Sequence, residues 1–148
     1  CALVSDSDGS TYAFHVASNH GQSSSVLPLK HHRDIWPEVR FDRTIQLTGW
    51  TLPTLLERDG IDGRTYDALV LDTQGAEMSV LRGAGSLLRG FRYVKVEAAD
   101  FELYEGCCTL AELSAFLARY GYAERSRRRF ARRPEGGSCF DVVFERRR

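Results

Sequence analysis

The chain has 148 residues, with 20 basic and 20 acidic side chains, so its formal net charge is zero. Its hydrophobic fraction of 43% is ordinary for a soluble globular protein, and its length suits one domain with a proper core. Neither value suggests nucleic acid or a membrane as a partner, and no apolar run approaches the roughly 18 residues of a membrane span.

The N-terminal part is predicted to be rich in strands. Residues 1–4 are typical of the end of a strand, and the turn cluster 5–10 (SDSDGS) is typical of a hairpin leading into a strand over 11–17, where apolar and polar residues alternate. A polar loop follows at 18–25 (SNHGQSSS), and 40–47 is predicted to be another strand. Because the chain lacks an initiator methionine, we expect a fragment or a processed product.

The strongest local pattern lies between Tyr66 and Gly85 (YDALVLDTQGAEMSVLRGAG). Four consecutive apolar residues, 68–71, predict a central strand that is buried on both faces of a parallel sheet. From Ala76 onward, apolar residues recur every three or four positions, which predicts a helix. The loop 72–75 (DTQG) would then lie at the carboxyl end of a strand, where open parallel sheets bind their ligands.

A second strand is predicted over 91–97 (FRYVKVE), and Glu97 falls at its carboxyl end. If this strand is a parallel neighbour of the first, Glu97 and Asp72 lie at the same edge of the sheet and face one crevice. The acidic loop 98–108 can form one wall of a substrate pocket there.

The C-terminal third is predicted to contain one helix and a strand pair. Thr109 and Glu112 fit a capping box at the start of this helix, and Gly121 ends it. Residues 122–126 and 138–145 are predicted to form a closing antiparallel pair, separated by sequence rich in arginine and glycine. Interleaved arginines can bind phosphate backbones, but a coding bias toward arginine explains them better, so no nucleic-acid partner is predicted.

The segment LDTQGAEMSVLRGAG, followed by YVKVEA and then by TLAELSAFLARYGY, resembles the C-terminal half of the FkbM-type S-adenosylmethionine-dependent methyltransferases. Those proteins carry an acidic-x-(Glu or Gln)-Gly-Ala-Glu segment, then Leu-Arg-Gly-Ala, then a strand that ends in Glu. The resemblance covers roughly residues 2–121. It implies an α/β fold, namely the C-terminal part of a class I, Rossmann-like sheet, with S-adenosylmethionine as cofactor and a hydroxyl of a sugar or secondary metabolite as methyl acceptor.

On this basis the chain is a single, partial methyltransferase domain over 1–148. Residues 1–47 form a β-hairpin and strands, 48–121 a βαβα core, and 122–148 an Arg-rich strand pair. The Gly-rich turn with which class I methyltransferases approach the cofactor has no counterpart upstream of Tyr66. A non-catalytic remnant or interaction module is therefore the alternative. A sheet cut beside its central strand would expose an apolar edge, so we also expect poor solubility or a homo-oligomer.

The resemblance and the sheet geometry together suggest the catalytic residues. Transfer of a methyl group to a hydroxyl needs a place for the hydroxyl proton, and a carboxylate whose pKa is raised by burial can take it. Asp72 is the first choice for this base and Glu97 the second, while Glu77 helps to hold the loop. The alternative for Asp72 and Glu77 is that they only cap the helix.

For the ligands, the resemblance implies that Ala2 and Leu3 line the adenine pocket, with Asp72 also on the cofactor side; a plain hairpin edge is the alternative for Ala2 and Leu3. Gln74, Ser24 and Asp100 are the predicted substrate contacts.

No metal site is predicted. A divalent ion held by Asp72, Glu97 and Asp100 would be chemically reasonable, but no motif establishes one. The loop histidines lack the spacing of a zinc site (His20, His31 and His32). The cysteines also show no metal spacing, and we expect reduced thiols in a cytoplasmic protein (Cys1, Cys107, Cys108 and Cys139).

Overall fold

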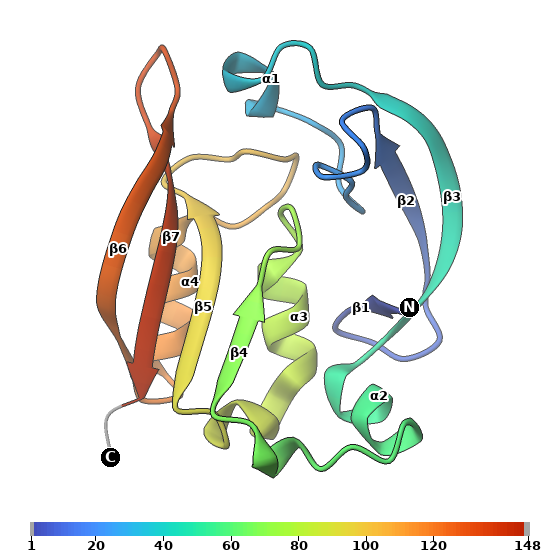
Figure 1. The fold of residues 1–148 in the computed structure, drawn as a ribbon, viewed down its shortest axis with the longest axis vertical. Coiled ribbons are helices and arrows are strands. Elements are labelled where there is room, and N and C mark those ends of the chain that lie inside the picture. The colour runs from blue at the N-terminus through green and yellow to red at the C-terminus, as the bar shows by residue number, and fades with distance from the viewer. Residues whose placement is uncertain (1, 147–148) are drawn as a thin grey trace.

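The structure is a computed structural model that describes residues 2–146. Cys1 and residues 147–148, which the predicted first strand and basic terminus include, lie outside the described residues. The chain forms a mixed α/β fold with two sheets, a three-stranded one of order β1-β3-β2 and a four-stranded one of order β4-β5-β7-β6 (Figure 1). Among residues 2–146, no helix is long and apolar enough to cross a membrane.

The three-stranded sheet consists of β1 (Leu3–Val4), β2 (Thr11–Ala17) and β3 (Phe41–Trp50). β2 and β3 pair in antiparallel fashion, whereas β1 pairs in parallel with the end of β3. The predicted hairpin between residues 1–4 and 11–17 is therefore wrong. The turn after β1 wraps around Gly49 instead, where the Gly9 amide donates to the Gly49 carbonyl and the Gly49 amide donates to the Ser10 carbonyl.

The four-stranded sheet consists of β4 (Ala68–Leu71), β5 (Tyr93–Ala99), β7 (Ser138–Arg146) and β6 (Tyr122–Arg132). β4 and β5 are parallel, and the other two pairs are antiparallel. β4 lies at one edge of this sheet, so the prediction of a central strand buried on both faces is wrong. Leu71 is 5% exposed, but Val70, which points to the other face, is 64% exposed.

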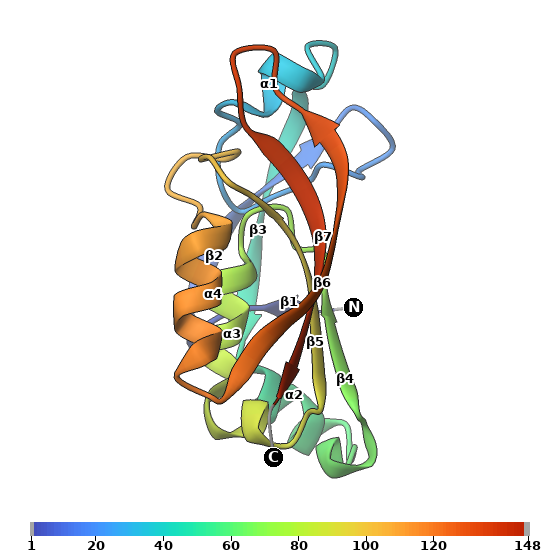
Figure 2. The same cartoon turned by 90° about the vertical axis from the view of Figure 1, so that its left-hand side faces the viewer.

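Two helices cover one face of this sheet, and Figure 2 shows the other face without a helix over it. They are α3 (Glu77–Ala84), which continues as the 3-10 turn η2 (Gly85–Arg89), and α4 (Leu110–Ala118). The predicted capping box of α4 is confirmed, with the Thr109 side chain accepting from the Glu112 amide and the Glu112 side chain accepting from the Thr109 amide. The core lies between the two helices and the sheet.

Three short helical segments lie in the connections: α1 (His32–Ile35), α2 (Leu52–Arg58) and the 3-10 turn η1 (Gly63–Thr65). α2 has Thr51 as its N-cap and a proline in its first turn, where proline is tolerated.

Helix α3 also joins the two sheets. A Cβ on Gly83 would lie 2.0 Å from the carbonyl oxygen of Ser5, so only glycine allows this close approach. On the same side of α3, the Asp6 amide donates to the Ser79 hydroxyl at 3.2 Å. The contact holds the segment after β1 against α3.

The prediction that the Arg-rich segment separates the two closing strands is wrong. The segment is part of strand β6 itself, which runs to Arg132. Cross-strand ion pairs explain why an arginine run is stable in a strand. Arg128 pairs with Asp141 at 2.9 Å and Arg125 with Glu145 at 2.7 Å, both on β7.

Candidate functional site

The parallel pairing of β4 and β5 brings two predicted carboxylates to one edge of the sheet. Leu71 and Val96 are paired in register, so Asp72 and Glu97 directly follow a matched pair of residues in neighbouring strands. Asp72 comes right after β4, whereas β5 runs two residues past Glu97 to Ala99, so Glu97 lies near the end of its strand and not at it as predicted. The predicted neighbourhood of the two strands is thus confirmed. Both side chains line one crevice of about 600 Å³.

The crevice is acidic and partly aromatic. Its lining contains three carboxylates, three side-chain amides, three aromatic rings including one imidazole, and no lysine or arginine (Asn19, Gln22, Ser23, His32, Trp36, Glu38, Val39, Asp72, Gln74, Glu97 and Phe130). These residues come from the 18–39 segment, from the ends of β4 and β5, and from β6, so segments far apart in the sequence meet there. Such a surface attracts cations and hydroxyl groups and repels anions.

The loop after β4 is held in one conformation. Gln74 has a positive φ of 51°, and its side chain accepts from the Tyr104 hydroxyl at 2.8 Å while donating to Asp72. The Ser25 hydroxyl donates to the Gln74 carbonyl at 2.6 Å. Gly75, with a φ of 98°, passes under the ring of Tyr104, where a Cβ would lie 3.0 Å from the ring. The Gln74 amide is therefore fixed in orientation at the crevice.

Glu77 holds the same loop from inside. It is 4% exposed and accepts from the Thr73 amide at 2.9 Å, the Thr73 hydroxyl at 3.1 Å and the Gly75 amide at 3.3 Å. Burial raises the pKa of its carboxyl group. With these three donors around one oxygen, the geometry gives Glu77 a positioning role.

Glu97 is the carboxyl group of the crevice whose pKa lies near neutral pH. Burial raises its pKa to about 7, and the negative charges of Asp72, Asp141 and Glu77 add to the effect. Glu97 is therefore close to half ionised near neutral pH. Asp72, in contrast, is exposed and accepts from the Gln74 amide.

One wall of the crevice is formed by α1 and the residues on either side of it, and the sequence did not predict this wall. His32 is only 2% exposed, its Nε2 lies 3.1 Å from the Ser23 hydroxyl, and its ring lies 4.7 Å from that of Trp36. Burial lowers the pKa of His32 to about 4, so the ring is neutral at neutral pH. No motif marks this wall in the sequence, since a histidine or tryptophan in a loop has no periodic partner.

Four other predicted residues do not line the crevice. Ser24 accepts from the Ala17 amide at 3.0 Å inside its own loop, and the neighbouring Ser23 lines the crevice instead. Asp100 accepts from the Ser138 amide at 2.8 Å and so caps β7. The N-terminal pair lies on or beside β1 in the other sheet (Ala2 and Leu3).

Within residues 2–146, no three acidic, histidine or cysteine side chains come close enough to hold a metal ion. Asp72, Glu97 and Asp100 in particular do not form such a set, because Asp100 is used at the start of β7. Among the described cysteines, burial raises the pKa of Cys107, and it raises the pKa of Cys108 and of Cys139 to about 12, so these three thiols are protonated at neutral pH.

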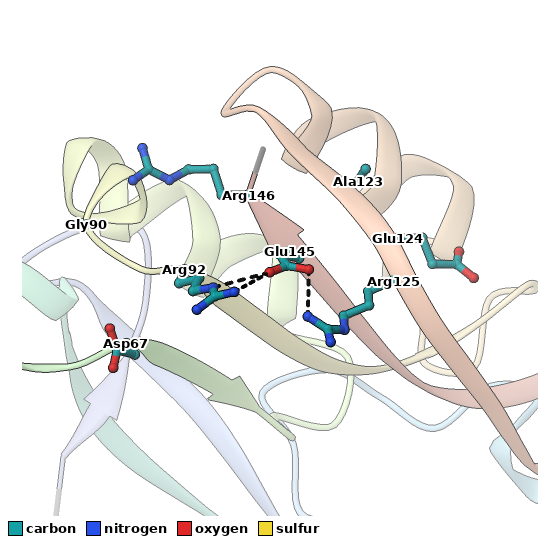
Figure 3. A pocket seen from close by; sticks show the side chains of 8 residues that line it. All are labelled: Asp67, Gly90, Arg92, Ala123, Glu124, Arg125, Glu145 and Arg146. Carbon is teal, nitrogen blue, oxygen red and sulfur yellow. Dashed lines mark hydrogen bonds and ion pairs between the residues drawn. The ribbon is translucent and has the colours of Figure 1, made fainter. Parts of the chain in front are cut away.

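A second pocket, of about 560 Å³, lies at the opposite end of the same strands (Figure 3). Its charges are matched: Glu145 lies between Arg92, at 3.0 Å, and Arg125, at 2.7 Å. A third cavity, of about 680 Å³, lies along α3 and α4, on the face of the sheet that the helices cover. The acidic crevice, unlike these two pockets, lies at the carboxyl ends of β4 and β5 and contains a carboxyl group with a pKa of about 7, that of Glu97.

Comparisons with known proteins identify the family. The model of the methyltransferase FkbM domain matches residues 1–123. The 2-O-methyltransferase NoeI of Sinorhizobium fredii (strain NBRC 101917 / NGR234) is 31% identical over 123 residues, which make up 79% of this chain and 49% of NoeI. The chain thus spans about half the length of this curated relative. No solved structure matches the chain. As its motifs predicted, the chain belongs to the FkbM methyltransferase family.

Proposed function

We propose that the chain carries the acceptor side of an S-adenosylmethionine-dependent O-methyltransferase with a class I, Rossmann-like sheet, and that the acceptor is a sugar hydroxyl. The observation that carries the proposal is the pair of carboxylates, Asp72 and Glu97, in one crevice at the carboxyl ends of parallel strands. The β4-α3-β5 unit supports the sheet class, because a helix between neighbouring parallel strands is the basic unit of such folds.

In this proposal Glu97, and not Asp72, takes the hydroxyl proton. Methyl transfer would form a carbon–oxygen bond at the acceptor as the carbon–sulfur bond of the donor breaks and leaves a thioether, and the hydroxyl proton must leave during or after that step. A general base works best when its pKa lies near the working pH, and the Glu97 carboxyl has a pKa of about 7. Asp72 contributes its negative charge, which helps to keep the pKa of Glu97 high, and it orients the Gln74 amide.

The described residues fit the proposed cofactor on the basis of charge. When bound, S-adenosylmethionine supplies an electrophilic methyl group on a positively charged sulfur. The crevice presents Glu38 and Asp72 together with the aromatic ring of Trp36, and carboxylates and aromatic faces both stabilise a cation. Asp72 and Glu38 are therefore the residues proposed to hold the cofactor on this side; Ala2 and Leu3 remain a proposal for its adenine.

The acceptor proposal rests on the mixture of side chains. A sugar presents hydroxyl groups around its edge and C–H bonds on its ring faces. Side-chain amides such as Asn19, Gln22 and Gln74 can bond the hydroxyls, and the rings of Trp36 and Phe130 can cover a face. The name of NoeI places its own methyl group on an oxygen, which agrees with an O-methyltransferase.

The test is transfer of a radiolabelled methyl group from S-adenosylmethionine to methyl glycosides by this chain, measured from pH 5.5 to pH 8.5. Because the ionised form of Glu97 accepts the proton, the rate should rise with pH and level off above about 7. Glu97→Gln should lower the rate by about 10²- to 10⁴-fold. Glu57→Gln, the same change on the exposed side of α2, should leave it unchanged.

A Glu97→Gln variant as active as the parent would remove Glu97 as the base. If the parent chain shows no turnover, thermal unfolding with S-adenosylhomocysteine shows whether the chain still binds a ligand of this kind or is a non-catalytic module. A ligand at a hundredfold excess over its dissociation constant stabilises the folded state by about 2.7 kcal/mol. An unchanged midpoint would favour the alternative, a non-catalytic module of the same family.

A further inference from the structure

The crevice includes a residue that the family comparison does not reach. The family match ends at residue 123, the second residue of β6, whereas the β6–β7 hairpin continues to Arg146. Phe130 of β6 lines the crevice and is 40% exposed, although large apolar side chains are usually covered. This exposed ring faces the same space as Asp72 and Glu97, so it is available to a bound acceptor.

An ion pair fixes the tip of this hairpin on α1. Arg133 lies just after β6, and its side chain is only 17% exposed. Its Nε donates to Asp34 of α1 at 2.6 Å, its Nη2 lies 2.6 Å from Glu135, and its guanidinium stacks 5.6 Å from the ring centre of Phe101. Because α1 and its C-cap carry His32 and Trp36, the pair connects two walls of the crevice.

The base of the hairpin tip is fixed as well. The Ser138 amide donates to the Asp100 side chain at 2.8 Å, and the Asp100 amide donates to the Ser138 carbonyl at 3.1 Å. A Cβ on Gly137 would lie 2.6 Å from the ring of Phe101, so the turn sits directly on this loop. The α1 segment rests on the same loop, since the His32 amide donates to the Leu103 carbonyl. The β6–β7 hairpin and α1 therefore both pack on the loop that follows β5.

We propose that the β6–β7 hairpin is the wall that selects the acceptor: Phe130 packs on the apolar face of the acceptor ring, and the Arg133–Asp34 ion pair is the positioning contact that sets Phe130 relative to Trp36. The proposal rests on the proposed function, in which the acceptor binds in this crevice. It also gives Asp100 an indirect role. The sequence predicts Asp100 as a substrate contact, but its side chain accepts from the Ser138 amide and so helps to hold the hairpin in place.

The positioning contact can be tested without any acceptor. The chain has two tryptophans, so a Trp50→Phe background leaves Trp36 as the fluorescent reporter. In that background, Arg133→Gln and Asp34→Asn should each make Trp36 more accessible to quenching by acrylamide. The double variant should be no more accessible than the more affected single one, because the Arg133–Asp34 contact is absent from all three.

The matched control is Arg128→Gln, which removes an ion pair of the same hairpin on the face of the sheet, away from α1. It should leave the quenching of Trp36 unchanged. Equal quenching in all variants would show that the Arg133–Asp34 pair does not hold α1, and would overturn the positioning role. Thermal unfolding of each variant checks that it is folded.

The wall itself is tested by calorimetric binding of the methyl α-glycosides of D-glucose, D-galactose and D-mannose. Phe130→Ala should weaken the glycoside that binds best by about five- to tenfold, the usual worth of one aromatic contact, and change the order of preference. S-adenosylhomocysteine should bind equally well. The control is Ile45→Ala on β3, because Ile45 is similarly exposed, at 38%, and does not line the crevice.

Unchanged glycoside affinity in Phe130→Ala, or an equal loss in Ile45→Ala, would overturn the role of Phe130. If the parent chain binds no glycoside, the sugar-acceptor proposal fails with it and so does the selecting wall, whereas the quenching experiment still decides the positioning contact. The two failures are therefore distinguishable.

Discussion

The two faces of the four-stranded sheet are built from the same strands but carry different chemistry. The face under α3 and α4 is apolar, and four of its residues are at most 1% exposed (Val94, Val96, Val142 and Phe144). The other face, which no helix covers in Figure 2, carries rows of paired charges across the strands. In one row Asp141 lies 2.8 Å from Lys95 and 2.9 Å from Arg128.

The difference teaches that the uncovered face has two uses along its length. Over β5, β7 and β6 the charge rows suit water, so these strands need no cover. Near the carboxyl end of β5 the same face carries Glu97, whose pKa is raised by burial and, to a smaller extent, by the neighbouring negative charges. β4 is the exception, because it is apolar on both faces and its uncovered side presents Val70.

The largest expected difference between the faces comes from two adjacent residues of β7. Phe144→Ala leaves a cavity in the core and should reduce the free energy of unfolding by about 3–5 kcal/mol. Val143→Ala, on the uncovered face, should cost less than about 1 kcal/mol. Urea unfolding of both variants measures this; similar losses would mean that the uncovered face is also packed.

A smaller effect is expected from the charge row. Asp141→Asn removes the partner of Lys95 and Arg128 and should cost about 0.5–1 kcal/mol at pH 7, since the row is open to solvent. Hydrogen bonds from Lys95 and Arg128 lower the pKa of Asp141 in the folded state. Its contribution is therefore present above the unfolded pKa of about 4 and is lost as the pH falls through the lower, folded value.

The same variant should act on the site, because the charge of Asp141 helps to raise the pKa of Glu97. The pH at which methyl transfer reaches half its plateau should move to lower values in Asp141→Asn. Asp67→Asn, the same change at the exposed start of β4, should change neither the stability nor the pH profile. A profile that shifts equally in both variants would show that the charge row is not specifically coupled to the base.

Local patterns made much of the fold predictable. The capping box of α4 and the alternation of β2 depend on residues close in sequence, and both are observed. The errors concern pairing over distance. Two residues, 3 and 4, cannot reveal that their partner is β3, and the apolar pattern of β4 is the same whether a strand lies on one side of it or on both. The Arg run of β6 resembled a loop because its carboxylate partners lie on another strand.

The site divides in the same way. Asp72 and Glu97 could be placed together from sequence, because neighbouring parallel strands end at one edge. His32 and Trp36 could not, because the 28–39 segment reaches the crevice only by resting on the loop around Leu103, some 70 residues later. Phe130 could not be placed at the site for a different reason, since it belongs to the part of β6 that the sequence did not predict as a strand.

The smallest effect on stability, with a distinct effect on assembly, is expected at the free edge of the sheet. Within residues 2–146, β4 has a strand neighbour only on the β5 side, and Val70 and Tyr66 are 64% and 52% exposed. An apolar edge strand of this kind favours pairing with another copy, so we expect the chain to self-associate through β4. Val70→Glu should reduce the association seen by light scattering. It should hardly change the free energy of unfolding, because the new carboxylate lies beside Lys95 in register.

Ile45→Glu makes the same change at an exposed position of the other sheet and should leave association intact. If Ile45→Glu disperses the assemblies and Val70→Glu does not, the chain associates through the three-stranded sheet and not through β4. If the parent chain is monomeric at high concentration, the exposed edge of β4 does not cause association.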